Sequence, residues 1–222
     1  MKTAEIPFED FGGSGDVIHI AHANGFPAGS YKQLAQNLIS DYRVIGMNAR
    51  PLWVDEDYKK VRSWYTLAKD LIRFLDEKQL SNIIGVGHSF GSIITMIAAN
   101  RRPDLFSKLV LIEPVILPKN LQRVVSFAPV PVLKRVAPII RTAGNRTDLW
   151  ESQKEVFAHF RIKKVFKHIS DDILWDYVRS VITATDKGKV KLAYSKEWEA
   201  HIFATVANPW TQIKNLKLPY LA

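Results

Sequence analysis

The sequence predicts an α/β fold: a mostly parallel β-sheet with helices on both faces and a helical insertion. In the first half of the 222-residue chain, short apolar runs alternate with amphipathic segments, the pattern of strands linked by helical crossovers. After Pro114 this alternation stops, and helical patterns follow one another almost to the end. With 47% apolar and 24% charged residues, the chain can bury a sizeable core.

Strand and helix candidates alternate regularly before Pro114. Four apolar runs have the length of buried strands: 17–21, 43–47, 83–87 and 109–112. Apolar side chains at helical spacing predict helices between them: 30–39, 64–75 and 92–99. Right-handed crossovers place such helices on both faces of a parallel sheet. Ligand sites then gather at the carboxyl ends of the strands.

The second half predicts a cap inserted into the sheet domain. We expect residues 1–118 and 208–222 to form the sheet domain and residues 119–207 to form a helical cap without strands. Three segments of the cap have helical patterns: 147–160, 170–184 and 195–206. Prolines interrupt the apolar run 124–140, a pattern typical of a mobile lid or a lipid-facing surface.

The formal net charge of +9 is concentrated in the cap. Residues 119–196 contain 16 Lys and Arg against 7 Asp and Glu, which accounts for the whole excess. Such a stretch can attract anionic substrates or acidic lipid headgroups, or can form an ordinary solvated helix surface. No nucleic-acid-binding motif accompanies the charge, so we expect no nucleic-acid partner. Peripheral membrane contact through the basic cap remains open.

Composition also limits the cellular compartments in which the protein is expected. The chain has no cysteine, the N-terminal residues lack the apolar segment of a signal peptide, and no run is long and apolar enough to span a bilayer. We therefore expect a cytoplasmic protein. No metal or organic cofactor is implied, and the oligomeric state stays undetermined.

The most informative motif is Gly87-His88-Ser89-Phe90-Gly91, which reads G-x-S-x-G between a strand candidate and a helix candidate. A serine at a sharp strand-to-helix turn is pushed into a cleft, and small neighbours allow helix and strand to approach closely. The helix N-terminus also directs free N–H groups at developing negative charge. The pattern predicts that Ser89 is a nucleophile; the alternative is a turn whose serine only caps the helix.

With these elements in place, the chain resembles the α/β-hydrolase superfamily. The resemblance is carried by the serine turn, the segment His22–Pro27, the strand and turn 109–114, and the helical cap. Asn24-Gly25-Phe26-Pro27 is similar to the His-Gly-x-Pro element of the family, with Asn24 in place of the His. The resemblance implies that the backbone amides of Phe26 and Phe90 form an oxyanion hole; the alternative is an ordinary loop between strand and helix.

The resemblance implies a serine hydrolase, lipase-like or esterase-like, that cleaves a carboxylic ester or related acyl bond. Relatives that open epoxides or remove halogens carry an aspartate where this chain has Ser89. The cap is rich in apolar and aromatic side chains, which favours a small-molecule substrate with an apolar moiety. The same side chains can equally pack the cap helices together.

One departure from the family pattern is important. The family places its acid and its catalytic His after further strands, and this chain ends at Ala222, within a predicted strand. The final strands and helix are therefore expected to be missing, because the sequence stops before the end of the full chain, because the gene is cut short, or because a second chain supplies them by swapping; we favour the first two explanations. None of the six histidines takes the expected place, and Glu113 is a weak substitute for the acid. We expect the 222-residue form to be inactive alone; the alternative is a catalytically silent binding protein.

Overall fold

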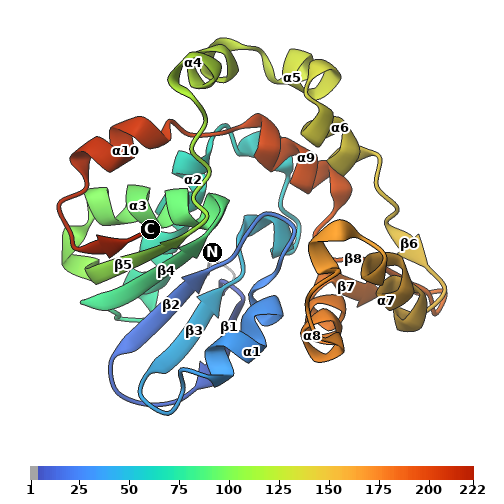
Figure 1. Cartoon of the computed structure of the whole chain (residues 1–222), viewed down its shortest axis with the longest axis horizontal. Helices are drawn as coiled ribbons and strands as arrows, with labels where there is room; N and C mark the ends of the chain where they lie inside the picture. The colour runs from blue at the N-terminus through green and yellow to red at the C-terminus, as the bar shows by residue number, and fades with distance from the viewer. Residues whose placement is uncertain (1–4) are drawn as a thin grey trace.

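The computed structural model describes residues 5–222, which form a six-stranded main sheet with helices on both faces (Figure 1). In spatial order the strands are β1 (Phe8–Gly12), β3 (Arg43–Met47), β2 (Val17–Ala21), β4 (Ile83–His88), β5 (Phe106–Ile112) and β9 (Tyr220–Leu221). Strand β1 runs antiparallel to β3, and the other neighbours pair in parallel. The predicted α/β class is confirmed.

Side chains alternate between the two faces of the sheet, as strand geometry requires. Ile83, Leu109 and Leu111 join the larger core beneath α2 (Trp64–Glu77), α3 (Phe90–Arg101) and α10 (Pro209–Asn215). On the opposite face, Ile84 and Val86 pack in a smaller core that includes Ala35 of α1 (Lys32–Gln36). Both faces of β4 are thus buried, which explains its uninterrupted apolar sequence.

The structure refines the predicted elements. Two of the four predicted strands have the predicted bounds, the other two match within one and three residues, and the final residues do start a strand. The helix predicted over 30–39 is wrong in part, because the chain first forms a 3-10 helix (Ala28–Tyr31) and then the short α1. Strand β1 was not predicted, since its sequence FEDFG is half exposed at a sheet edge and carries two acidic residues.

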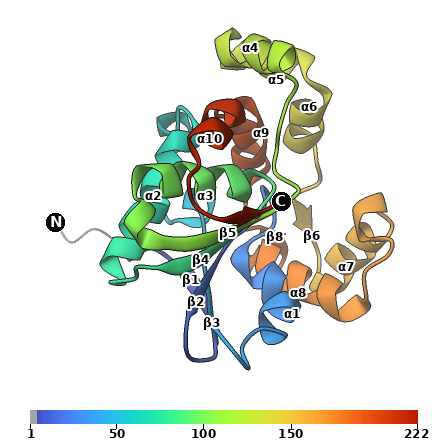
Figure 2. The same ribbon diagram turned by 60° about the vertical axis from the view of Figure 1, so that its left-hand side comes forward.

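Residues 119–207 lie outside the main sheet (Figures 1 and 2). Their helices are α4 (Lys119–Phe127), α5 (Val130–Val136), α6 (Pro138–Gly144), α7 (Gln153–Arg161), α8 (Asp171–Val181) and α9 (Lys196–Ala204). No helix formed by residues 5–222 is long and apolar enough to cross a membrane. The predicted domain boundaries at 118/119 and 207/208 stay predictions.

The prediction of a cap without strands is wrong. A second, three-stranded antiparallel sheet has the order β6 (Leu149–Trp150), β8 (Val190–Leu192) and β7 (Ile182–Ala184). Strands of two or three residues are too short to show an alternating pattern, which is why the sequence concealed them. Consequently, the helices predicted over 147–160 and 170–184 are shorter, because β6 precedes α7 and β7 follows α8 directly.

Candidate active site

Ser89 lies between the end of β4 and the start of α3, in a half-buried position. Its backbone angles are φ 56° and ψ −118°, a region that costs a side-chain-bearing residue about 1–3 kcal/mol. The strained turn is held in place by the end of β5, because the Ser89 N–H donates to the carbonyl of Ile112 at 2.9 Å. The surrounding structure therefore forces this serine into an unusual conformation.

Two glycines make this turn sterically possible. A Cβ on Gly91 would lie 2.7 Å from the carbonyl oxygen of His22 and closer still to that of Ala21. A Cβ on Gly87 would lie 2.6 Å from the backbone nitrogen of Ser92. Both distances are below any real carbon contact, so only glycine allows α3 to approach β2 this closely. The buried Ser92 hydroxyl donates to the Gly87 carbonyl at 2.6 Å and closes the turn.

The two predicted oxyanion residues come from adjacent strands. Ala21 is paired with Gly87, so the loop after β2 and the serine turn meet at the same edge of the sheet. Phe90 is the first residue of α3, where helix geometry leaves the N–H without an intrahelical acceptor. The Phe26 N–H donates to the Ala23 carbonyl at 3.0 Å. This amide would have to share or release that bond to bind an oxyanion.

Tyr31 connects the two loops, a role that the sequence analysis missed. Its hydroxyl accepts a hydrogen bond from the Ala23 N–H at 2.9 Å and lies 2.7 Å from Nδ1 of His88. Burial raises the pKa of Tyr31, so the phenol stays protonated and can act as donor to Nδ1 of His88. Burial also lowers the pKa of His88, which suits an uncharged acceptor. The chain neighbour of Ser89 is thereby anchored to the loop after β2.

Asn24 joins the loop after β2 to the cap. Its side-chain oxygen accepts from the Tyr194 hydroxyl at 2.7 Å, and its side-chain nitrogen donates to the Glu199 carbonyl at 3.1 Å. Asn24 and Tyr194 are both buried. Asn24 thus ties the loop after β2 to α9, a contact across 175 positions that no local pattern could predict.

Two buried histidines near the site form hydrogen bonds that hold backbone segments in place. Both ring nitrogens of His22 are engaged, Nδ1 with the Ala23 carbonyl at 2.8 Å and Nε2 with the Ala49 N–H at 2.9 Å. Nε2 of His19 accepts from the Met47 N–H at 3.2 Å. Burial lowers the pKa of His22 to about 4 and that of His19 to about 3. Both imidazoles are therefore neutral acceptors that fix backbone segments.

The remaining histidines are distributed over the cap. His201 contacts the Val61 carbonyl through Nε2 at 2.7 Å, His159 is half-buried on α7, and His168 is exposed. Glu113 is exposed after β5, near enough to His88 to oppose the lowering of its pKa. Within residues 5–222, no hydrogen bond joins the Ser89 hydroxyl to a histidine, and no cluster of three potential metal ligands occurs.

A cavity of about 830 Å³ opens beside the loop after β2, between helices of the cap. Phe26 is the predicted site residue that lines it, whereas Ser89 and Phe90 do not. The Phe26 ring packs against Phe166 at 5.8 Å and Tyr177 at 4.9 Å, so it forms the boundary between sheet domain and cap. We refer to this space below as the cap cavity.

This fold and this strained serine turn define a class of α/β proteins with a candidate nucleophile between strand and helix. A family model described as "alpha/beta hydrolase fold" matches residues 20–138, more than half of the sequence. The chain belongs to this family, and the resemblance noted from the sequence is confirmed.

Curated relatives and solved structures agree with this assignment. A probable esterase of Oryza sativa is 41% identical over 107 residues, and a karrikin insensitive 2 receptor of Petunia hybrida is 37% identical over 106. Each match covers 46% of this chain and 39% of the relative, so the chain spans about two-fifths of their length. The crystal structure of E-2-(acetamidomethylene)succinate hydrolase is similar in fold, with a TM-score of 0.74 and 18% sequence identity. The superposition covers 96% of this chain and 74% of that chain.

The close approach at Gly91 predicts a large effect of one methyl group. We expect Gly91→Ala to lower the free energy of unfolding by about 3 kcal/mol or more, because the new Cβ overlaps two backbone carbonyls. Urea unfolding followed by circular dichroism measures this change. Gly144→Ala is the matched control, since the nearest atom there lies at an ordinary 3.7 Å. Equal stability of the two variants would show that α3 does not touch β2.

The buried histidines predict a pH-dependent stability. The pKa of His22 is about 4 in the folded protein and about 6.5 when unfolded, so the unfolded state binds the proton first as the pH falls. Stability is fully present above pH 6.5 and decreases below it by about 1.4 kcal/mol per pH unit for each such histidine. Urea titrations between pH 7 and 5 measure the slope. His22→Asn should reduce it, whereas Asn37→Ala, a substitution at an exposed residue without a titratable group, should not.

Proposed function

We propose that this chain carries the nucleophile of a serine hydrolase that cleaves a carboxylic ester or a related acyl bond. The observation that supports this most strongly is the conformation of Ser89. A positive φ at a serine, retained at an energetic cost between β4 and α3, is expected where the geometry serves a reaction. A serine needed only to cap the helix would not require it, and the Ser89 side chain makes no capping hydrogen bond.

In the proposed reaction, Oγ of Ser89 forms a bond to the carbonyl carbon of the ester. The hydroxyl proton passes to a base, and the electron pair of the C=O bond moves to the oxygen. The Phe90 amide, with the Phe26 amide once it leaves Ala23, stabilises that oxyanion; each such donor typically lowers the barrier by about 3 kcal/mol. The electron pair then returns to re-form the C=O bond, the C–O bond to the alcohol breaks, and the alcohol leaves with the proton held by the base. Water, activated by the same base, later attacks the acyl-enzyme and releases the acid and the Ser89 hydroxyl.

The base is the missing part of this scheme. The two most buried histidines use Nε2 to accept backbone N–H groups, and His88 is held by Tyr31. We therefore propose that the His and the acid come from outside residues 5–222. Because the chain spans 39% of the relatives' length, this activity is proposed for the whole protein. A location in the cytoplasm also stays a prediction.

A catalytically silent binding protein is the second candidate. It is favoured by the absence of a base next to Ser89 among the described residues, and one of the relatives above is named as a receptor. In this alternative the serine turn is retained as part of a ligand-binding surface, and Ser89 performs no chemistry.

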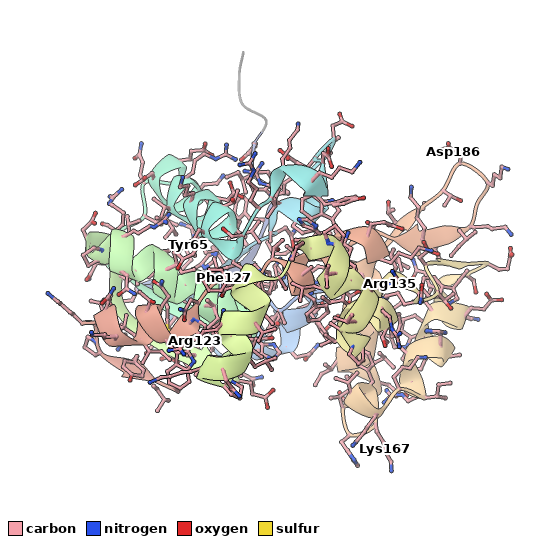
Figure 3. The ribbon with its side chains drawn as sticks, turned by 90° about the horizontal axis from the view of Figure 1, so that it is seen from above. Tyr65, Arg123, Phe127, Arg135, Lys167 and Asp186 are labelled. Carbon is pink, nitrogen blue, oxygen red and sulfur yellow. The ribbon has the colours of Figure 1, made fainter. Side chains whose placement is uncertain are left out.

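We also propose that α4 and α5, which we call the outer cap, contact anionic lipid. Between Pro114 and Thr147 the sequence has six basic residues and no Asp or Glu. Helix α4 buries only Gln122, whereas Phe127 is 86% exposed and Val124 is 62% exposed. Figure 3 shows Arg123, Phe127 and Arg135 on these outer helices. Exposed apolar side chains between cations are complementary to a negatively charged bilayer surface.

The serine hydrolase predicts covalent labelling at a single residue. A fluorophosphonate probe should modify Ser89 in the full-length gene product, as detected by peptide mass spectrometry, and Ser89→Ala should abolish the signal. Ser40→Ala is a matched comparison, because Ser40 is exposed in the turn before β3 and its substitution should leave Ser89 available. Labelling that survives Ser89→Ala would contradict the assignment. An unlabelled full-length protein would support the silent alternative.

The missing base predicts that residues 1–222 alone turn over p-nitrophenyl acetate no faster than their Ser89→Ala variant. Release of p-nitrophenol, followed by absorbance, measures this difference. A rate that is clearly higher for the unmodified chain would place a working base within these residues.

The lipid contact predicts flotation with anionic vesicles. Vesicles of 30% phosphatidylserine in phosphatidylcholine should carry the protein to the top of a density gradient, whereas pure phosphatidylcholine should not. Phe127→Asp combined with Arg123→Glu should abolish flotation, while Lys187→Glu with Lys191→Glu, which are exposed elsewhere in the cap, should not. Equal flotation of both variants would exclude this surface.

A further inference from the structure

The charged groups that line the cap cavity are mostly positive. They are Arg141, Arg146, His159, Lys163 and Glu199, contributed by α6, the segment after it, α7, the loop after α7, and α9. Glu199 is the sole carboxylate among the lining residues, and its charge is already matched by Arg146. The charges of Arg141 and Lys163 therefore line the cavity without an acidic lining residue to balance them.

Arg146 is held in a fixed position at the cavity wall. Its guanidinium donates to the Glu199 carboxylate, and both side chains are largely buried, at 17% and 13% exposure. The guanidinium carbon also lies 5.6 Å from the centre of the Phe160 ring, a cation–π contact. Nη2 of Arg146 is buried and has no hydrogen-bond partner of good geometry within residues 5–222, while the hydroxyl of Tyr177, which also lines the cavity, lies close enough to act on the Arg146 charge. A buried guanidinium N–H without an acceptor lowers the stability of the fold, unless a ligand accepts a hydrogen bond from it.

The positive groups also act on one another. Burial lowers the pKa of His159, and the charges of Lys163 and Arg146 lower it further. Both cations are therefore close enough to His159 to disfavour its protonation. A neutral imidazole among cations can still donate one hydrogen bond. This cluster has the composition of a receptor for a compact anion.

Apolar side chains form much of the remaining cavity wall, beside the polar Thr142, Asn145, Thr147 and Tyr177. Phe26, Phe160, Phe166 and Phe203 line it together with Ile139. A ligand that fills it needs an apolar body as well as a charged end. Phe26, whose backbone amide is the proposed oxyanion donor, is the proposed site residue that lines this cavity.

We propose that the cap cavity binds organic anions in which a carboxylate or phosphate group is joined to an apolar body. The anionic end lies among the basic lining residues Arg141, Arg146 and Lys163, beside His159, and the body packs on the phenylalanine rings. This inference deepens the proposed function, on which it rests for its link to catalysis: the preferred substrates are esters whose acyl or alcohol part ends in an anion.

Calorimetric titration of the Ser89→Ala variant tests binding without any turnover. The probes are 4-phenylbutyrate, phenyl phosphate and the uncharged 4-phenylbutyramide. We expect one of the two anions to bind about tenfold more tightly than the amide, because a hydrogen bond to a charged group is lost with the amide. The preferred anion identifies the headgroup. Equal affinity for the amide and both anions would overturn the proposal.

A pair of charge-reversed variants locates the site. Arg141→Glu with Lys163→Glu should weaken anion binding about tenfold, because two cavity cations become repulsive. Lys164→Glu with Lys167→Glu makes the same change in net charge at exposed residues that do not line the cavity. Lys167 projects from the tip of the cap in Figure 3. Equal losses in both variants would mean that the anion responds to the overall charge and would overturn the assignment to this cavity.

The imidazole of His159 supplies a readout inside the cavity. Its pKa, followed by NMR, should rise when the preferred anion is added, because the ligand charge offsets Lys163 and Arg146. An unchanged pKa at saturating ligand would contradict the placement. Since Ser89 is absent from this experiment, failure of anion binding is distinguishable from failure of the hydrolase proposal, which depends on labelling of Ser89.

Discussion

The contact between Gly91 and the carbonyls of Ala21 and His22 constrains the whole site. Helix α3 can begin immediately after Ser89 only because its second residue has no side chain to hold it away from β2. The same approach places the loop after β2 beside the serine turn and forces Ser89 to a φ of 56°. Local strain at one residue is therefore tolerated because two strands and a helix converge on it.

The sheet domain and the cap are coupled through the loop that follows β2. Tyr31 ties this loop to His88, Asn24 ties it to Tyr194 and α9, and the Phe26 ring closes one side of the cap cavity. A ligand that rearranges the cavity would therefore also displace Phe26, whose backbone amide is the proposed oxyanion donor. This arrangement links the substrate preference, which we assign to the cap, to the chemistry, which we assign to the sheet domain.

The sequence predicted the parts of the molecule that short-range patterns encode. Apolar runs located four strands, and the G-x-S-x-G spacing located the turn at Ser89, because both depend on neighbouring residues. The small sheet β6-β8-β7 escaped prediction, since two or three residues cannot display a period. Long-range contacts such as Asn24 with Glu199 or Tyr31 with His88 leave no periodic signal at all. The relation of the cap cavity to Phe26 likewise required the fold.

We propose that Ser89 and the amides of Phe26 and Phe90 act on one carbonyl group. A crystal structure of the full-length protein with a bound phenylboronic acid is the sharpest test of this proposal. We expect boron bonded to Oγ of Ser89, with one boronate oxygen accepting hydrogen bonds from both amides and the Phe26 N–H turned away from Ala23. A boronate bonded elsewhere, or one on Ser89 whose oxygens avoid both amides, would contradict it.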